Sequence, residues 1–344
     1  MYTYTEGHCR LISIGTYIPK QIITSAELMR EIESEKRFGI SVEWLERVTG
    51  IKERRFTEES FKPSDMAVIA AKEALQKANL LAKDIDAIIY CGLFRDYLIE
   101  PATAHVVQTK LGSKHALAFD VTNACHGFMN AIHLMDALIA TGQAKTGLIV
   151  TGEKPSTVVR MALDKIRKVN DRHQFIQLSS GLGLGDAGGA IVVGRKKDPT
   201  TGFMGFMLRS ESNLYAHSTC GNEVETTYLQ ADLTPLISHG IRLLNEMYPV
   251  FMSKLNWDSE DIFAYVQHQA SKKMLKEIAE YCHAPLAKLV DTVTYYGNLV
   301  SANIPLNLQF LNKDRMPTYG DKILLTGGGS GIVVSKAGLI WDEG

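Results

Sequence analysis

Short apolar runs alternate along the whole chain with longer stretches in which apolar positions recur at helical spacing. The runs have the length and composition of buried β-strands, for example at residues 87–92, 146–153, 188–196 and 321–328. Strands that alternate with helices in this way are typical of layered α/β proteins. The pattern therefore predicts an α/β fold in which strands and helices occupy separate layers.

The same order of elements occurs twice. Four segments of the first half have counterparts in the second: AIIYCG (87–92) matches FAYVQHQ (263–269), FDVTNAC (119–125) matches LVDTVTYYGN (289–298), TGLIVTGE (146–153) matches DKILLTGG (321–328), and GGAIVVGRK (188–196) matches SGIVVSKAG (330–338). A helical stretch precedes the first member of each series. We infer an internal duplication with one half at 1–196 and the other at 197–344.

Composition narrows the class of protein. A chain of 344 residues is long enough for two packed cores, and 37 basic residues against 38 acidic ones argue against nucleic acid as a partner. No apolar run approaches the length of a membrane span, and the N-terminus does not read as a signal peptide, so we expect a cytoplasmic protein. Five scattered cysteines suit a reducing compartment and leave thiols for chemistry.

Cys125 is the candidate nucleophile. It follows the apolar strand and turn at 117–124, and the helix after it carries its apolar residues on one face, at Phe128, Ala131, Ile132, Met135, Leu138 and Ile139. A thiol at a helix N-terminus is expected to have a lowered pKa, because the free amides and the helix dipole favour the thiolate. The alternative is a small buried core residue, which suits Cys9, Cys91 and Cys282.

His268 and Asn298 are expected at the same edge of the fold. His268 follows the strand 263–267 and precedes a helix, while Asn298 follows Gly297, which permits a tight turn. In a parallel sheet, ligands bind beyond the carboxyl ends of the strands. A thiol nucleophile with two neutral hydrogen-bonding partners suits acyl transfer, in which the partners stabilise an enolate oxygen.

Six motifs carry a resemblance to a known family. DVTNACHGF, VQHQAS, TYYGN, SANIP, GDAGGA and LLTGGGSG are similar to motifs of the 3-oxoacyl-(acyl-carrier-protein) synthase III group of the thiolase superfamily and occur in that family's order. The resemblance covers nearly the whole chain. It implies a five-layered αβαβα fold with internal duplication, normally a homodimer, that acts on thioesters of coenzyme A or acyl-carrier protein without a bound cofactor.

The same resemblance assigns residue roles. Cys125, in the first half, would be the acylated nucleophile, and His268 and Asn298, in the second, would bind the thioester carbonyl of the second substrate. The backbone amides of Cys125 and Gly328 would form the oxyanion hole. The enzyme would be a ketosynthase, and its product would be a β-keto compound.

A second resemblance concerns FRDYLIEPATAHVVQTKLG (94–112). This segment is similar to that of ketosynthases which join two acyl thioesters head to head in olefin, pyrone or resorcinol pathways. In that subgroup a glutamate before a proline is the base and enters the partner subunit's active site, which implies this role for Glu100. Ser271, in place of an asparagine, also resembles this subgroup. The alternative is decarboxylative condensation of a malonyl thioester, as in fatty-acid initiation.

Coenzyme A binding is predicted less directly. WLERVTGIKERR (44–55) resembles a segment near the family's coenzyme entrance, so Trp44, Arg54 and Lys272 are candidates for contact with the adenine or the phosphates. Val48 stands where the fatty-acid-initiating members carry an arginine, which argues against adenine binding by Trp44.

Other classes of protein fit this sequence less well. Residues 183–188 match a dinucleotide fingerprint formally but precede a strand instead of a helix. The segment 217–220 offers only half of a zinc site, so no metal is assigned. A cysteine hydrolase and a non-catalytic acyl-binding scaffold remain as alternatives; the first would release free acid, and the second would form no acyl-enzyme.

Overall fold

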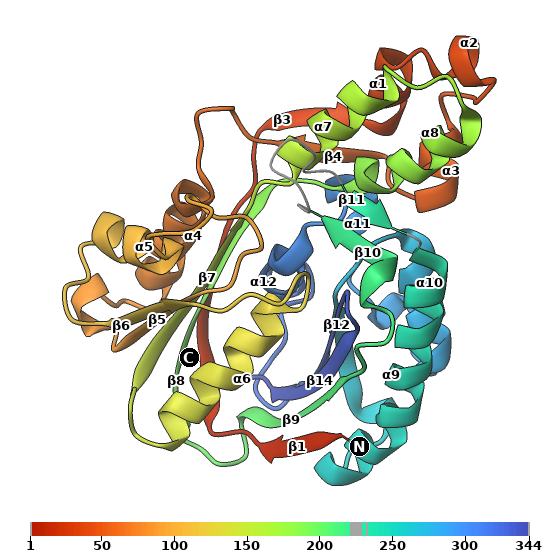
Figure 1. Cartoon of the computed structure of the whole chain (residues 1–344). Helices are drawn as coiled ribbons and strands as arrows, with labels where there is room; N and C mark the ends of the chain where they lie inside the picture. The colour runs from red at the N-terminus through yellow and green to blue at the C-terminus, as the bar shows by residue number, and fades with distance from the viewer. Residues whose placement is uncertain (1, 221–228, 232, 343–344) are drawn as a thin grey trace.

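The computed structural model describes residues 2–220, 229–231 and 233–342. Two five-stranded sheets form its centre (Figure 1). The first sheet contains, in spatial order, β2 (Cys9–Tyr17), β8 (Ala187–Arg195), β7 (Thr146–Glu153), β5 (Ala87–Tyr90) and β6 (Leu117–Asp120). The second contains β1 (Thr3–Glu6), β9 (Gly202–Ser210), β14 (Val333–Ile340), β13 (Lys322–Gly329) and β12 (Ile262–Gln267).

The strand order of the two sheets repeats. β5 runs parallel to β7 and β7 antiparallel to β8, just as β12 runs parallel to β13 and β13 antiparallel to β14. β2 and β9 occupy equivalent places beside β8 and β14. Two differences break the repeat: β1, from the N-terminus, lies at the edge of the second sheet, and the counterpart of β6 is reduced to a single bridge between Tyr265 and Leu289.

Helices form three further layers (Figure 1). α4 (Pro63–Lys77) and α5 (Thr103–Leu111) cover the outer face of the first sheet; α6 (Gly127–Ala140) and α12 (Asn303–Arg315) lie between the sheets; α9 (Leu233–Leu255) and α10 (Lys272–Tyr281) cover the second sheet. The sequence therefore predicted the five-layered αβαβα fold correctly. Among the described residues, no helix is both long and apolar enough to cross a membrane.

The predicted elements form for the expected reasons. β7 is a central strand and is buried along nearly its whole length, which explains its continuous apolar run. α6 buries Phe128, Ala131, Ile132, Met135 and Ile139, the face that the spacing predicted. Ser271 caps α10, where its hydroxyl accepts a hydrogen bond from the Met274 amide at 3.2 Å.

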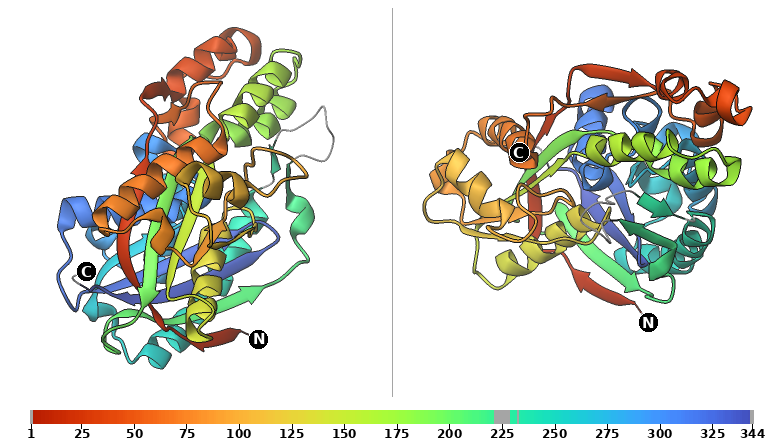
Figure 2. Two further views of the ribbon diagram at one scale, coloured as in Figure 1. Left: turned by 90° about the vertical axis from the view of Figure 1, so that its left-hand side faces the viewer. Right: turned by 45° about the horizontal axis from the view of Figure 1, so that its top comes forward.

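A cap stands over one end of both sheets (Figure 2). We use this name for residues 21–56 and 156–184, which include β3 (Gln21–Thr24), α1 (Ser25–Glu31), α2 (Ser34–Phe38), α3 (Trp44–Thr49), β4 (Glu53–Phe56), α7 (Ser156–Ile166) and α8 (Arg172–Leu178). The two segments of the cap are far apart in sequence but share one buried apolar cluster. Residues 179–183 form a 3₁₀ turn before β8, so the glycines at 183–188 lead into a strand and open no helix.

Candidate active site

Cys125 lies beneath the cap, in the turn between β6 and α6. It is partly exposed and packs against the cap's apolar cluster, which includes Leu184 and Val300. Ala124, directly before it, has a φ of 46°, a left-handed conformation that non-glycine residues seldom adopt. Such backbone conformations cost about 1–3 kcal/mol and gather at functional sites. The turn therefore holds the thiol at the rim of the sheet at some cost in stability.

The expected low pKa of Cys125 is wrong for this structure. Although the residue is partly exposed as a whole, its thiol is enclosed against the apolar cluster, and this burial raises the pKa of the thiol to about 12. The carboxyl group of Glu153 adds to this effect, while a backbone hydrogen bond offsets only part. Cys125 also lies two residues before Gly127, the first residue of α6, and so stands outside the helix. The helix dipole therefore stabilises its thiolate less than it would within the first turn. A raised pKa favours the neutral thiol in the resting site.

His268 is a buried, neutral imidazole at the end of β12. Its backbone amide donates to the carbonyl of Thr326 on β13 at 3.0 Å, which fixes it at the edge where the two strands end. Burial lowers the pKa of His268 to about 4, an effect that the nearby Val300 backbone offsets only in part. The ring is therefore uncharged at neutral pH and can offer one N–H donor.

Asn303 holds His268 and Asn298 together. Its amide nitrogen lies 3.2 Å from Asn298 Oδ1 and 3.2 Å from the Val300 carbonyl, two acceptors that require an NH₂ group there. The same nitrogen lies 3.0 Å from His268 Nδ1 and 3.4 Å from the Gln269 carbonyl, so its two N–H groups are shared among these neighbours. Asn303 therefore covers Nδ1, which leaves Nε2 as the ring nitrogen available to a ligand.

Asn298 is held in the complementary way. Gly297, with a φ of 71°, makes the predicted tight turn, and a Cβ there would lie 2.6 Å from the Gly183 carbonyl oxygen. Asn298 Oδ1 accepts from the Val300 amide at 2.9 Å as well as from Asn303. Since its oxygen is occupied from both sides, the NH₂ group of Asn298 is the part that remains for a ligand.

The glycines at the end of β13 connect the two halves of the site. A Cβ on Gly329 would lie 2.9 Å from Cβ of His126, the residue directly after Cys125, whereas a Cβ on Gly328 would meet nothing within 4 Å. Gly328 therefore has free space on the side to which a Cβ would project, and its role in an oxyanion hole stays a prediction. Thr326, two residues earlier, bonds the His268 amide, so β13 contacts both the Cys125 turn and the end of β12.

Glu100 lies on a loop at the surface of the single chain. It is exposed, and among the described residues it forms no hydrogen bond or ion pair. The loop that carries Glu100 starts near the candidate active site, where the Leu93 amide donates to Glu153 at 3.0 Å. At the tip of this loop, Leu98 is 83% exposed and Ile99 is 87% exposed.

The three candidates for coenzyme A binding differ in their surroundings. Arg54 is fully buried and donates to the Ile23 carbonyl and the Ser25 hydroxyl, so the structure gives no support to a contact with coenzyme phosphates. Lys272 is partly exposed and pairs with Asp291 at 3.1 Å. Trp44 is partly exposed and packs against Phe175, with ring centroids 5.6 Å apart.

Sequence reasoning missed two residues, Asn303 and Glu153. Asn303 stands within the SANIP motif, and Glu153 ends the strand TGLIVTGE at the position that Gly328 occupies in the duplicated strand. The repeat itself was thus a signal for Glu153. Neither residue could be assigned a role without its partners, which are distant in the sequence.

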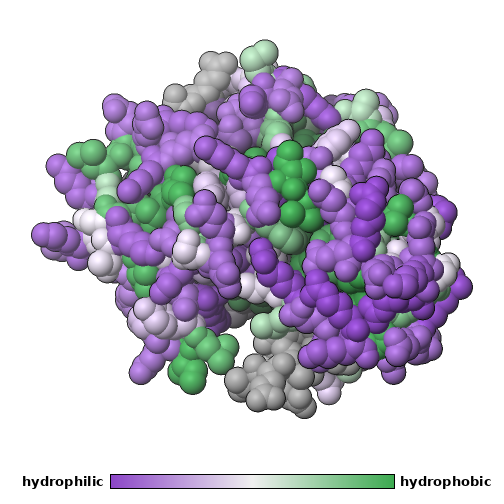
Figure 3. Space-filling model, turned by 90° about the horizontal axis from the view of Figure 1, so that it is seen from above, coloured by the Kyte–Doolittle hydropathy of each residue, from purple (hydrophilic) through white to green (hydrophobic). Residues whose placement is uncertain are grey.

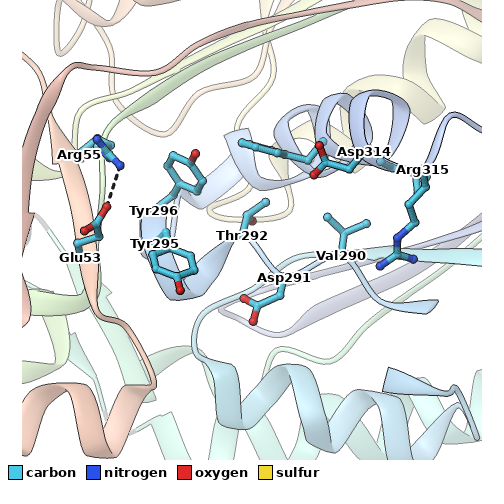
Figure 4. A pocket seen from close by; sticks show the side chains of 11 residues that line it. Glu53, Arg55, Val290, Asp291, Thr292, Tyr295, Tyr296, Asp314 and Arg315 are labelled. Atoms are coloured by element: carbon cyan, nitrogen blue, oxygen red, sulfur yellow. Dashed lines mark hydrogen bonds and ion pairs between the residues drawn. The ribbon is translucent and has the colours of Figure 1, made fainter. Parts of the chain in front are cut away.

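A separate pocket of about 330 Å³ lies behind the turn that carries Asn298 (Figure 4). Arg55 and Glu53 of β4 pair at 2.7 Å on one side of it, and Arg55 lies over the ring of Tyr296. Arg315 lies toward the other end of the pocket and donates to the Leu289 carbonyl.

Seen from above, the molecular surface is mostly hydrophilic, with separate small hydrophobic patches (Figure 3).

Two family models match the chain. The model described as 3-oxoacyl-[acyl-carrier-protein (ACP)] synthase III matches residues 119–212, and the model for the C-terminal part of that enzyme matches residues 252–341. The β-ketoacyl-[acyl-carrier-protein] synthase III of Aquifex aeolicus is 32% identical over 326 residues, which cover 94% of this chain and 96% of that protein. The enzyme of the same name from Helicobacter pylori is 29% identical and covers 96% and 98%.

Solved structures superpose on this chain over nearly its whole length. A histidine-to-alanine variant of Xanthomonas campestris OleA superposes with a TM-score of 0.91 at 28% identity and covers 97% of this chain and 98% of that one. A cerulenin-bound structure of the same protein has a TM-score of 0.90 at 27% identity and covers 98% of both chains.

Proposed function

Because the chain belongs to the 3-oxoacyl-[acyl-carrier-protein] synthase III family and is therefore an acyltransferase of the ketosynthase type, we propose that it joins two acyl thioesters by Claisen condensation. Cys125 is acylated first. Its sulfur forms a bond to the acyl carbon, the thioester bond of the donor breaks, and the thiol proton leaves with the released carrier thiol. No cofactor takes part, and the donors are thioesters of coenzyme A or acyl-carrier protein.

The arrangement of His268 and Asn298 is the observation that carries this proposal. Asn303 lies against His268 Nδ1 and Asn298 Oδ1, which leaves the imidazole Nε2 and the Asn298 NH₂ for a ligand; we assign the ring proton to Nε2, so that both groups donate. Two preorganised neutral donors suit the carbonyl oxygen of a second thioester, where negative charge develops as its α-carbon loses a proton. The amides of Cys125 and Gly328 serve the acyl-enzyme in the same way.

Glu100 is the proposed base, and the condensation is proposed to release no carbon dioxide. A simple acyl thioester must lose an α-proton, for which a carboxylate is suited. Glu100 takes that proton, the α-carbon forms a bond to the acyl carbon on Cys125, and the cysteine leaves as a thiol after recovering a proton. The resemblance of residues 94–112 to head-to-head ketosynthases supports this version, as does the structural likeness to OleA.

A homodimer is part of the proposal. Glu100 is exposed in the single chain, and Leu98 and Ile99 beside it are apolar side chains that a partner would cover. β6 is an edge strand whose Leu117 is exposed, so a second copy can extend the sheet there. The occupant proposed for this surface is another copy of the chain, whose site would then receive Glu100.

A decarboxylative synthase is the second candidate. The curated relatives from Aquifex aeolicus and Helicobacter pylori carry the name β-ketoacyl-[acyl-carrier-protein] synthase III. A malonyl thioester generates its carbanion by losing carbon dioxide, so an enzyme that uses it has no need of Glu100. His268 and Asn298 would bind the same carbonyl oxygen in that reaction.

Variants at Cys125 and Glu100 test the proposal. Incubation with an acyl-coenzyme A should raise the intact mass of the wild type by one acyl unit, and Cys125→Ala should remove that increase. Glu100→Ala should still be acylated but should lose condensation, while Glu58→Ala, which changes an exposed glutamate of another loop, should retain both. An acyl adduct of full size on Cys125→Ala, or normal condensation by Glu100→Ala, contradicts the respective role.

A further inference from the structure

Glu153 is a fully buried carboxylate at the end of β7, next to the candidate active site. Its hydrogen-bond partners in the described residues are donors. The backbone amide of Leu93 reaches both of its oxygens, at 3.0 and 3.2 Å, and that of Phe94 reaches Oε2 at 3.3 Å. The hydroxyl of Thr151 donates at 3.2 Å. Backbone amides can only donate, so the carboxylate form of Glu153 fits this environment best.

Glu153 is also bonded to the turn that follows Asn298. Both the amide of Ser301, at 3.3 Å, and its hydroxyl donate to Glu153 Oε1. The Ser301 and Thr151 hydroxyls also lie 2.6 Å apart. One side chain therefore bonds the start of the Glu100 loop and the end of the Asn298 turn.

The turn needs such support, because Val300 has a φ of 54°. A left-handed conformation is costly for a β-branched residue and persists only where the surroundings enforce it. The Val300 amide bonds Asn298 Oδ1 on one side, and the next residue, Ser301, bonds Glu153 on the other. The positions of Asn298 and Asn303 thus depend on both contacts.

The titratable groups that face Glu153 are Cys125 from the turn before α6, and Tyr90 and Cys91 from β5 and its end; Glu153 raises the pKa of all three. No basic side chain pairs with it within the described part of the chain. Lys154, the next residue, donates instead to the carbonyls of Glu59 and Phe61. Burial raises the pKa of Glu153 to about 7, although the donors oppose this effect.

We propose that ionised Glu153 is a positioning residue that holds the loop of the base Glu100 and the turn of the oxyanion donor Asn298 in register with Cys125. This inference rests on the function proposed above. It gives Glu153 no contact with the substrate. Protonation removes acceptor capacity from a site with three backbone donors, so the loop and the turn should loosen together as the pH falls through the neutral range.

Hydrogen exchange of the uncomplexed protein tests the positioning role without reference to catalysis. In Glu153→Gln, peptides containing Leu93, Phe94 and Ser301 should exchange about tenfold faster or more, the factor expected when a hydrogen bond to a charged group is lost. In the wild type, after correction for intrinsic rates, the same peptides should lose protection between pH 8 and pH 6. The Gln variant should show no such pH dependence.

Asp186→Asn is the matched control. Asp186 is also a fully buried carboxylate, and it accepts from the amides of Thr57 and Ser156, both at 2.8 Å, but it bonds neither the loop nor the turn. Its variant should leave protection at Leu93, Phe94 and Ser301 unchanged. Equal loosening in both variants would mean that any buried carboxylate of this sheet end has the same effect, which overturns the proposal.

Kinetics supply a second readout. Glu153→Gln should still be acylated at Cys125 but should condense about 10- to 100-fold more slowly, because both partner groups are displaced. Its rate should lack the acidic limb that we expect for the wild type near pH 7. If Glu153→Gln does not fold, Ser301→Ala replaces it: loss of one donor to the carboxylate should move that limb to higher pH.

The outcomes separate this inference from the proposed function. Coupled loosening of loop and turn in a protein that condenses nothing would leave the positioning role intact and remove the function. Unchanged exchange in Glu153→Gln, or an acidic limb that Ser301→Ala does not move, would overturn the positioning role even if condensation occurs.

Discussion

At the scale of single residues, the amide of Asn303 decides which groups of the site are left to bind a substrate. It bonds His268 Nδ1 and Asn298 Oδ1, and its own Oδ1 has no partner within the described residues. These contacts join residues 35 and 5 positions apart in the sequence. A motif identifies the residue types, but only the folded arrangement determines which atom of each is free.

Asn303→Ala should therefore separate condensation from acylation. Without the amide, His268 can turn or change tautomer, and we expect condensation to fall by about 100-fold while acylation of Cys125 changes much less. Asn307→Ala is the control, because Asn307 is a buried asparagine one turn later on α12 that bonds the Gln267 carbonyl at 2.7 Å. Rapid-quench measurement of both steps checks this, and equal effects of the two variants on condensation would contradict it.

Residue chemistry was also where sequence reasoning failed. The position of Cys125 before a helix was predicted correctly, but the pKa was not, since burial and Glu153 outweigh the helix dipole. Arg54 was predicted at a coenzyme site and is fully buried. Both differences from expectation have one cause: the surroundings of a side chain depend on segments distant in the sequence, here the cap and β7.

At the scale of elements, the duplicated strands were predicted closely. The segments 146–153 and 321–328 coincide with β7 and, to within one residue, with β13. The exception is the counterpart of β6, where residues 289–298 form a bridge at Leu289 and a short helix, α11 (Val293–Tyr296). The Gln269 side chain accepts hydrogen bonds from the Thr292 and Val293 amides, which takes this backbone out of strand pairing.

The end of β13 offers a test of packing at this scale. A Cβ on Gly329 would meet the His126 backbone nitrogen at 3.1 Å and the Asn123 carbonyl oxygen at 3.2 Å, atoms that cannot move aside alone. Gly329→Ala should lower the free energy of unfolding by about 1–3 kcal/mol. Gly328→Ala, beside it and facing open space, should lower it far less; urea titration of both would contradict this if their order were reversed.

At the scale of the whole molecule, buried titratable groups link stability to pH. Burial lowers the pKa of His126 and of His268 to about 4. His126 lies 2.6 Å from Asn130 in its own half and 2.7 Å from Ser335 in the other, so it joins the two halves. The unfolded chain binds these protons near pH 6.5 and the folded one does not, so stability is lost as the pH falls from about 6.5 toward 4. Glu153 has a raised pKa and contributes in the opposite direction.

His126→Gln should reveal this contribution. The variant lacks the titrating ring, so its unfolding free energy relative to the wild type should rise by about 3 kcal/mol between about pH 6.5 and pH 4. The loss of two hydrogen bonds lowers its stability at every pH and does not affect the slope. Urea unfolding across this pH range checks the slope, and parallel curves for the two proteins would show that the pKa of His126 does not change on unfolding.

The central claim is that this ketosynthase joins two non-carboxylated acyl thioesters. The most direct measurement is product mass after incubation with a single acyl-coenzyme A and no malonyl donor, with carbon dioxide recorded. We expect a β-keto product that contains the carbons of two acyl chains, formed by Glu58→Ala as by the wild type and absent with Cys125→Ala or Glu100→Ala. A product that appears only when a malonyl thioester is supplied, with one carbon dioxide released per turnover, would contradict the account.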